Sequence, residues 1–167
     1  EAARFLRPSM EHLHDPLRLA DMPVAVDRLM RAIESRERIA VHGDYDVDGV
    51  TSTVILRRAL ELLGADVVHH IPDRLRDGYG LQPAAVDRLH TDGVRLIVSV
   101  DCGIRGIDAA QRAREVGIDL IVTDHHEPGS ALPPAHAIIN PRRHDCSYPD
   151  KDLAGVERAF RSYKTVD

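Results

Sequence analysis

The chain has 167 residues, a formal net charge of −5 and a hydrophobic content of 43%. These values predict one folded domain with a substantial core and exclude an intrinsically disordered chain. No apolar run reaches the length of a membrane span and the N-terminus is too charged for a signal peptide, so we expect a cytoplasmic protein without membrane association. The two cysteines predict no disulfide framework, and the negative charge argues against a large nucleic-acid footprint but not against a small site.

The chain divides into an N-terminal arm, residues 1–23, and a patterned body, residues 24–167. The arm contains three prolines and little periodicity, which predicts an extended segment packed on the body. The predicted helices of the body cover residues 24–35, 49–63, 83–92, 107–116 and 153–163, and Asp21-Met-Pro23 offers a start for the first of them. The predicted strands cover residues 38–43, 67–71, 95–100, 118–123 and 137–140. This alternation predicts an α/β domain with a Rossmann-like, mostly parallel sheet and helices on both faces.

Three aspartates at alternate positions, Asp44, Asp46 and Asp48, lie between the first predicted strand and the helix after it. In open α/β sheets, ligands bind outside the carboxyl ends of the strands, where this acidic turn lies. Carboxylates at this spacing repel one another, and a divalent cation such as Mg²⁺ or Mn²⁺ would relieve the repulsion. Taken alone, the turn is equally consistent with a solvated acidic surface. A calcium-binding EF-hand is excluded, because position twelve of such a loop is the apolar Ile55.

Two later predicted strands end in polar residues of the same kind. Asp101 follows the third strand, and the run Asp124-His125-His126 follows the fourth. Neighbouring parallel strands are about 4.8 Å apart, so the side chains at these ends can converge with the acidic turn. The coincidence of three such clusters predicts a metal site. His42, which ends the first strand just before the acidic turn, is a further candidate ligand.

Three other reactive side chains are predicted to be structural. Cys102 lies next to Asp101, and we expect a small buried packing residue there instead of a thiolate ligand. His69 and His70 are adjacent in a strand, so they face opposite ways and are not expected to form one site.

The loop from Pro72 to Leu81 carries Arg74, Tyr79 and two glycines. An arginine can hold a phosphate through two parallel hydrogen bonds, a tyrosine can stack on a base, and glycines allow close backbone approach. The loop therefore suggests a phosphate and base contact. A solvated connecting loop is the alternative.

Eight short motifs stand in a fixed order along the chain: Phe5-Leu-Arg-Pro8, Gly43-Asp-Tyr-Asp-Val-Asp-Gly49, Ile71-Pro-Asp-Arg74, Gly78-Tyr-Gly-Leu81, Asp101-Cys-Gly103, Asp124-His-His-Glu127, Ile139-Asn-Pro141 and Leu153-Ala-Gly-Val156. In this order and spacing, the set resembles the DHH phosphoesterase superfamily and, within it, the RecJ-type single-strand-specific exonucleases. Other branches, such as pyrophosphatases and cyclic-dinucleotide phosphodiesterases, share the acidic and Asp-His-His motifs only. The loop motifs therefore favour the exonuclease branch.

The resemblance implies two Mn²⁺ or Mg²⁺ ions. Their ligands would be the carboxylates and the imidazole at the strand ends: Asp44, Asp46, Asp48, Asp101 and His125, with His42 as a further candidate. Asp46, together with Asp44 or His42, would hold the first ion. Asp48 and His125 would hold the second ion, and Asp101 would bridge the two.

The resemblance also implies roles around the metals. His126 would lie near the scissile phosphate, and Asp124 would support the site. Arg74 would hold a nucleotide phosphate, while Tyr79 and Leu81 would pack near the terminal base. The implied activity is metal-dependent 5′→3′ hydrolysis of single-stranded DNA in repair and recombination. A single-strand-binding protein or a helicase would be a partner through regions that this chain does not contain.

Two departures from the family pattern shape these expectations. Glu157 and Arg158 stand where the family has Gly-Val, and the chain contains neither the further metal-binding Asp nor the second domain of family members. We therefore expect a C-terminally incomplete domain of weak activity. The alternatives are a catalytically silent module that binds metal or a partner, and a phosphodiesterase that acts on short oligonucleotides or cyclic dinucleotides.

Overall fold

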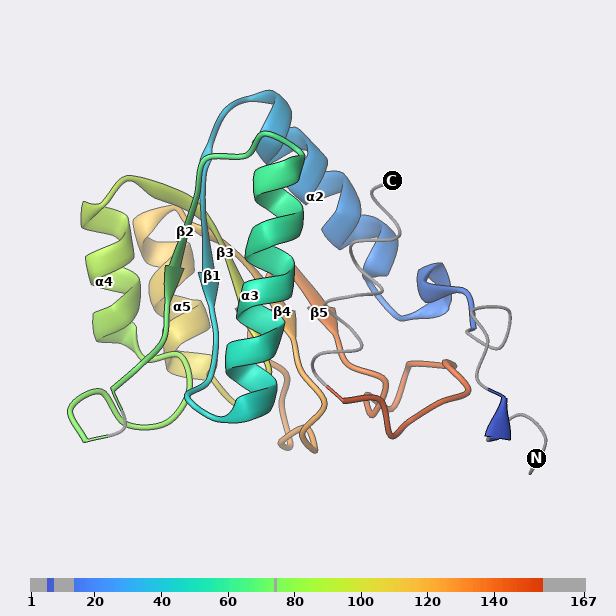
Figure 1. The fold of residues 1–167 in the computed structure, drawn as a ribbon. Helices are drawn as coiled ribbons and strands as arrows, with labels where there is room; N and C mark the ends of the chain where they lie inside the picture. The colour runs from blue at the N-terminus through green and yellow to red at the C-terminus, as the bar shows by residue number, and fades with distance from the viewer. Residues whose placement is uncertain (1–5, 8–13, 74, 155–167) are drawn as a thin grey trace.

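The computed structural model describes residues 6–7, 14–73 and 75–154, and the structural statements below refer to these residues. The helices are α2 (Met22–Glu34), α3 (Val47–Leu62), α4 (Pro83–Thr91) and α5 (Ile107–Val116), preceded by a short 3₁₀ helix, η2 (Pro16–Arg18) (Figure 1). The strands are β1 (Arg38–His42), β2 (Val67–His70), β3 (Val94–Val100), β4 (Asp119–Thr123) and β5 (Ala137–Ile139). No helix of the described residues is long and apolar enough to span a membrane.

The five strands form one parallel sheet in the order β2-β1-β3-β4-β5. The predicted α/β fold with a mostly parallel sheet is therefore confirmed. From β1 the chain first crosses outward to β2 and then returns to the other side at β3. The strand order thus reverses between β1 and β3, and the crevice at such a switch point is where doubly wound folds bind ligands.

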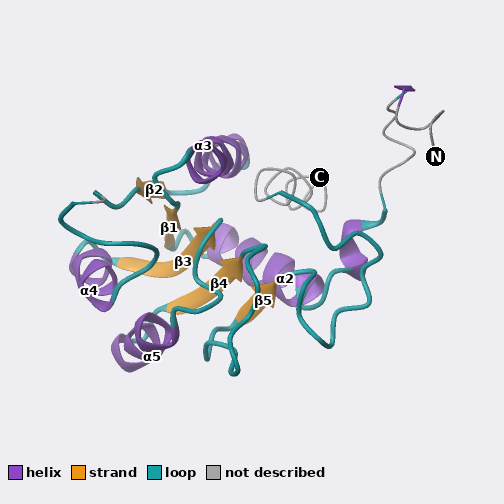
Figure 2. Cartoon of the chain, turned by 90° about the horizontal axis from the view of Figure 1, so that it is seen from below, coloured by secondary structure: helices purple, strands orange, loops and turns teal. Residues whose placement is uncertain are grey.

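Helices cover both faces of the sheet (Figure 2). On one face, α2 and α3 pack through Leu29 and Leu56 onto the strand residues Val41, Val98 and Ile121. On the other face, α4 and α5 pack onto the alternate strand residues through a second buried cluster. Because successive strand side chains point to opposite faces, unbroken apolar runs such as the one in β3 supply both cores. The strands β1, β3, β4 and β5 are largely buried and the edge strand β2 is partly exposed, so the carboxyl ends of the central strands are the open positions for a ligand.

The predicted boundaries are correct within one or two residues for every strand and for most helix ends. α2 begins at Met22, within the start that Asp21-Met-Pro23 predicts, and the Met22 side chain is buried in the core beside Leu19. One helix starts earlier than predicted. α3 begins at Val47, because the carboxylate of Asp46 accepts a hydrogen bond from the Gly49 amide at 2.9 Å and caps the helix.

Three predictions concern segments that the structure describes only in part. Within the predicted arm, residues 14–23 contain η2 and the start of α2, and residues 1–5 and 8–13 lie outside the described part. The predicted last helix starts at Leu153, but Leu153 and Ala154 are not helical and the remainder lies outside the described residues. The division of the chain at residues 23 and 24 stays a prediction.

Candidate metal centre

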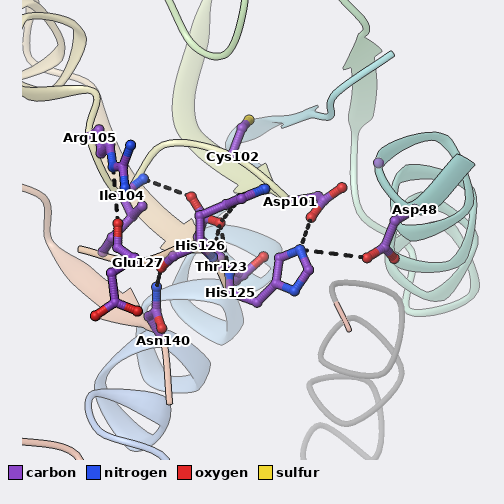
Figure 3. A network of polar contacts seen from close by, with 12 residues as sticks. Asp48, Asp101, Cys102, Ile104, Arg105, Thr123, His125, His126, Glu127 and Asn140 are labelled. Atoms are coloured by element: carbon purple, nitrogen blue, oxygen red, sulfur yellow. Dashed lines mark hydrogen bonds and ion pairs between the residues drawn. The ribbon is translucent and has the colours of Figure 1, made fainter. Parts of the chain in front are cut away.

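The candidate centre lies at the carboxyl ends of three adjacent strands. Asp101 directly follows β3 and Asp124 directly follows β4, and the register pairs the last residues of these strands, Val100 and Thr123. The acidic turn follows β1, the other neighbour of β3. Figure 3 shows the result: the His125 ring lies between Asp101 and Asp48, so groups from three strand ends meet.

Close backbone packing shapes the acidic turn. A side chain on Gly43 would collide with the Thr53 hydroxyl, and a Cβ on Gly49 would lie 2.6 Å from the Asp44 amide nitrogen. Asp44 is buried, and its Oδ1 accepts a hydrogen bond from the Tyr45 amide at 2.8 Å. Burial raises the pKa of Asp44, although the hydrogen bond from Tyr45 opposes this effect. Because Gly43 and Gly49 have no side chains, the acidic turn can pack closely against the first turn of α3.

Asp101 is the most perturbed carboxylate of the centre. It is 1% exposed and has a positive φ of 61°, a conformation that costs energy in a residue other than glycine. Its Oδ1 lies 2.9 Å from His125 Nε2 but accepts no hydrogen bond from the described residues. Burial first, and then the charges of Asp48 and Asp46, raise the pKa of Asp101 to about 7. A buried carboxylate oxygen in this state is suited to bind a cation.

Asp124 is as deeply buried as Asp101 but is fully supplied with donors. Its Oδ1 accepts hydrogen bonds from the amides of His125 and His126, at 2.7 and 3.0 Å, and its Oδ2 accepts one from the Ile104 amide at 2.9 Å. The His126 ring places Nδ1 2.7 Å from the same Oδ1. Burial would raise the pKa of Asp124, but these hydrogen bonds outweigh it and lower the pKa. Asp124 in turn raises the pKa of His126 and fixes its ring.

The structure brings part of the predicted ligand set into one cluster. Ligand atoms of Asp101, His125 and His126 all lie within 4.8 Å of one another. Asp48 Oδ2 lies 3.8 Å from His125 Nε2, at the edge of this cluster. Asp44 and Asp46 lie at the same sheet edge but outside the three-residue cluster. His126, predicted near the scissile phosphate, therefore belongs to the cluster itself.

His42 lies outside this cluster. Its buried ring stacks on His70 with 5.0 Å between ring centroids, and the two Nδ1 atoms are 3.1 Å apart. Burial, followed by the charge of His70, lowers the pKa of His42 to about 3, so the ring is neutral. Its role as a ligand stays a prediction.

The donor set fits a divalent cation. Among the ion pairs of the described residues, none joins an arginine or lysine to Asp44, Asp46, Asp101 or Asp124. Several buried or half-buried carboxylates that have no arginine or lysine partner are costly, and the cost falls when a cation neutralises them. Carboxylate oxygens mixed with imidazole nitrogens are donors that Mn²⁺ and related ions accept.

A cavity of about 190 Å³ adjoins the centre on the side of His126. Its lining comes from two loops and the Asp-His-His turn: Tyr79, Gly80, Leu81, Gln82, Gly103, Ile104, Arg105, Gly106, Asp124 and His126. Tyr79 is 52% exposed and stands edge-on to His126, with ring centroids 6.3 Å apart, whereas Leu81 is buried. Arg74, the predicted phosphate ligand, lies outside the described residues.

Sequence reasoning missed one residue of the centre, Asn140. It follows β5, is fully buried, and its Nδ2 donates a hydrogen bond to the His126 carbonyl at 2.9 Å. Its Oδ1 accepts one from the Arg142 amide at 2.8 Å, which closes the next turn. A polar residue directly after a buried strand was the available signal, as it was for Asp101 and Asp124.

The fold and these residues define a doubly wound α/β domain with an acidic, imidazole-bearing centre at its switch point. The family model described as "DHH family, N-terminal domain" matches residues 38–166, and the chain belongs to this family. It is 44% identical over 162 residues to the single-stranded-DNA-specific exonuclease RecJ of Bacillus subtilis (strain 168), covering 96% of this chain and 21% of that protein. To the protein of the same name from Escherichia coli (strain K12) it is 44% identical over 160 residues, covering 95% of this chain and 28% of that protein.

The solved structures give the same relationship. The crystal structure of exonuclease RecJ bound to manganese superposes with a TM-score of 0.81 at 38% identity, over 89% of this chain and 37% of that one. The chain thus spans about a quarter of the length of the curated relatives named above, between 21% and 28%.

Proposed function

We propose that this chain is the metal-binding hydrolytic domain of a single-stranded-DNA-specific exonuclease that cleaves phosphodiester bonds in the 5′→3′ direction. One observation carries the proposal: Oδ1 of the buried Asp101 carboxylate accepts no hydrogen bond from the described part of the chain and lies beside His125, which also contacts Asp48. The relatives named above support it, because they are single-stranded-DNA-specific exonucleases and their sequences match almost the whole chain. Repair and recombination are the processes that require this activity.

Two Mn²⁺ or Mg²⁺ ions are proposed at the centre. The residues that would hold them are the candidates at the strand ends: Asp44, Asp46, Asp48, Asp101 and His125, with His42 as a further candidate. The His126 ring lies within 4.8 Å of the ligand atoms of Asp101 and His125. Asp101 is the proposed bridging residue, because it lies between the acidic turn and the Asp-His-His turn. The chemistry that such a pair supplies when bound is activation of a water and neutralisation of charge on the attacking and leaving oxygens.

The protein groups around the centre have complementary roles. Asp124 holds Nδ1 of His126 and so leaves Nε2 of that ring for the substrate. Because the pKa of His126 is raised, the ring can donate a hydrogen bond or a proton to a phosphate oxygen near neutral pH. Asn140 holds the His126 carbonyl and fixes the backbone of the same turn.

The proposed substrate is a single strand that enters beside Tyr79. Its ring is half exposed above the cavity next to His126, and an aromatic face of this kind stacks on bases without sequence preference. Leu81 closes the cavity from below, and Arg74 remains the proposed phosphate ligand. A duplex could present no unstacked base to Tyr79, which agrees with specificity for single strands.

A second candidate is a metal-binding module that does not cleave DNA by itself. It is favoured by the net charge of −5, which leaves little basic surface to hold a polyanion. We therefore expect slow, salt-sensitive hydrolysis by the 167-residue chain.

Hydrolysis of a 5′-phosphorylated single-stranded oligonucleotide in Mn²⁺ tests the proposal. The chain, its Asp101→Asn variant and the Bacillus subtilis relative are compared at low salt, with the matching duplex as a second substrate. The proposed function predicts slow release of mononucleotides from the single strand and none with Asp101→Asn. Equal rates for the chain and the variant, or a preference for the duplex, would refute it. Metal binding without any hydrolysis would favour the silent module.

A further inference from the structure

The segment between β2 and α4 contains a turn that is closed by hydrogen bonds between Asp73 and Asp77. Asp77 Oδ2 accepts a hydrogen bond from the Asp73 amide at 2.9 Å. In return, the Asp73 carbonyl accepts hydrogen bonds from the amides of Arg76 and Asp77, at 3.1 and 2.8 Å. These bonds hold the turn together but do not by themselves attach it to the rest of the domain.

One guanidinium attaches this turn to the domain. Arg88 projects from α4 and places an Nη2 nitrogen 3.2 Å from Asp77 Oδ1. The same nitrogen lies 3.5 Å from Nε2 of His70, the last residue of β2. Arg88 thus joins the turn to a helix and to the edge strand of the sheet at one point.

The His70 ring that Arg88 contacts also lies against His42. The Nδ1 atoms of the two rings are 3.1 Å apart, and the ring centroids are 5.0 Å apart. His42 ends β1, two residues before Asp44, so the contacts starting at Asp77 end beside the acidic turn.

Tyr79 lies two residues after Asp77. The glycines on either side of it, Gly78 and Gly80, have positive φ values of 79° and 71°, so the chain bends sharply at both. After Gly80 the chain is held again, because Leu81 is buried in the core. Tyr79 therefore lies in a short segment that is held by the contacts of Asp77 on one side and by the buried Leu81 on the other.

We propose that Arg88 is a positioning residue that holds Tyr79 in place beside His126 through its contact with Asp77. The inference rests on the proposed function, in which Tyr79 contacts the terminal base. Arg88 does not itself reach the centre. The competing explanation is an ordinary surface ion pair, since the Arg88 and Asp77 side chains are 52% and 23% exposed. An ordinary pair would affect neither the motion of the turn nor the binding of a strand.

Arg31 provides a matched control. It forms an exposed pair with Asp27 on α2, and its N···O distance of 3.2 Å equals that of the Arg88–Asp77 pair. Arg31→Ala and Arg88→Ala remove the same charge, but only Arg88 contacts the turn before Tyr79. Arg88→Lys keeps the charge and should restore part of the effect.

Amide hydrogen exchange of the 167-residue chain tests the anchoring without any DNA. An exposed pair shifts a local equilibrium by about two- to fivefold, so exchange at the Asp73 and Asp77 amides should accelerate by that factor in Arg88→Ala. Arg31→Ala should leave these amides unchanged, and both variants should keep the wild-type melting temperature and Mn²⁺ affinity. Unchanged exchange in Arg88→Ala, or equal acceleration in Arg31→Ala, would overturn the proposal.

Fluorescence anisotropy with a 5′-phosphorylated single strand then tests the consequence for binding. Arg88→Ala should weaken binding by about two- to fivefold relative to Arg31→Ala, and in turnover assays it should raise KM and leave kcat unchanged. Equal affinities for the two variants, with faster exchange only in Arg88→Ala, would overturn the positioning role. A wild-type chain that binds no single strand would instead refute the proposed function, while the exchange result would still decide whether Arg88 anchors the turn.

Discussion

The two ends of the parallel sheet differ in how their buried charges are paired. At the amino end, the buried Arg28 donates to Asp119 and to Glu37, each at 2.6 Å, so its charge is paired twice. At the carboxyl end, Asp44 and Asp101 are buried without an arginine or lysine partner among the described residues. The first end is complete as a folded structure. The second end holds the carboxylates that we propose as ligands of a cation.

The same contrast recurs between two neighbouring turns at the carboxyl end. Asp101 and Asp124 are each 1% exposed, but the pKa of Asp101 is raised and the pKa of Asp124 is lowered. Burial acts on both, and the difference is the supply of hydrogen bonds to Asp124 from three amides and an imidazole. The Asp124 carboxylate is stabilised by hydrogen bonds within the fold, whereas the Asp101 carboxylate is the one that we propose to bind a cation. A carboxyl group with a strongly perturbed pKa at a sheet edge is a candidate for a functional position.

Neutralising Asp101 should have the largest effect on this contrast. We expect Asp101→Asn to weaken Mn²⁺ binding by about a hundredfold or more, since replacing residues that merely support a metal ligand already costs about ten- to a hundredfold. Without metal, the variant should be at least as stable as the wild type at pH 7, because it removes a poorly solvated charge. Calorimetric titration and thermal melting measure the two quantities.

Asp108→Asn is the control for this prediction, because it removes the same charge from an exposed position in the first turn of α5. It should leave Mn²⁺ affinity unchanged. Equal affinities for Asp101→Asn and Asp108→Asn would show that Asp101 is not a ligand.

Breaking the paired end should change stability and leave the metal centre intact. Arg28→Ala removes hydrogen bonds to two carboxylates, but Asp119 and Glu37 are 45% and 29% exposed and can be hydrated. We therefore expect a loss of about 1–3 kcal/mol in the free energy of unfolding. Denaturant titration measures this loss. A drop in Mn²⁺ affinity of the folded variant would contradict the separation of the two ends.

Asn140→Ala should have a smaller effect on metal binding than Asp101→Asn. Asn140 fixes the His126 carbonyl from β5 without reaching the ligand cluster, so its loss should loosen the Asp-His-His turn. We expect Mn²⁺ affinity to fall by about tenfold, in the range found for residues that support metal ligands. Titration of the folded variant at a temperature well below its melting point checks this. An unchanged affinity would show that Asn140 serves the fold alone.

The sequence was sufficient to predict the sheet and to predict that the loops after β1, β3 and β4 lie close together. Buried apolar runs located all five strands, and parallel crossovers required Asp101 and the Asp-His-His turn to share one edge. The expected packing role of Cys102 is confirmed, since its side chain is fully buried. His69 and His70 do face opposite ways: His69 contacts Arg57 on α3, and His70 contacts Arg88 on α4.

Details that depend on strand neighbours and backbone torsions could not be predicted. The pairing of His42 with His70 requires knowing that β1 and β2 are adjacent in register. The positive φ of Asp101 leaves no pattern in the sequence. The helix start was placed two residues late, at 49, because Asp46 was considered only as a metal ligand and not also as a helix cap.

The pH dependence of the metal-free chain offers the smallest and most specific test of the contrast. Asp101 has a pKa of about 7 in the fold and an ordinary value of 3.8, so between these values the folded state retains a proton that the unfolded state releases. The linkage slope is then negative, and Asp101 should lower stability as pH rises from about 4 to 7. Asp44 shifts in the same direction and Asp124 in the opposite one, so the wild type alone would show a mixture. The difference in melting temperature between the wild type and Asp101→Asn isolates the Asp101 contribution. Over this pH range, the melting temperature of the wild type should fall by a few degrees relative to that of Asp101→Asn. Saturating Mn²⁺ should reverse the trend, because a bound cation favours the ionised carboxylate. A difference that stays flat with pH in the absence of metal would mean that Asp101 is already neutralised by the fold, and the two ends of the sheet would then not differ as described.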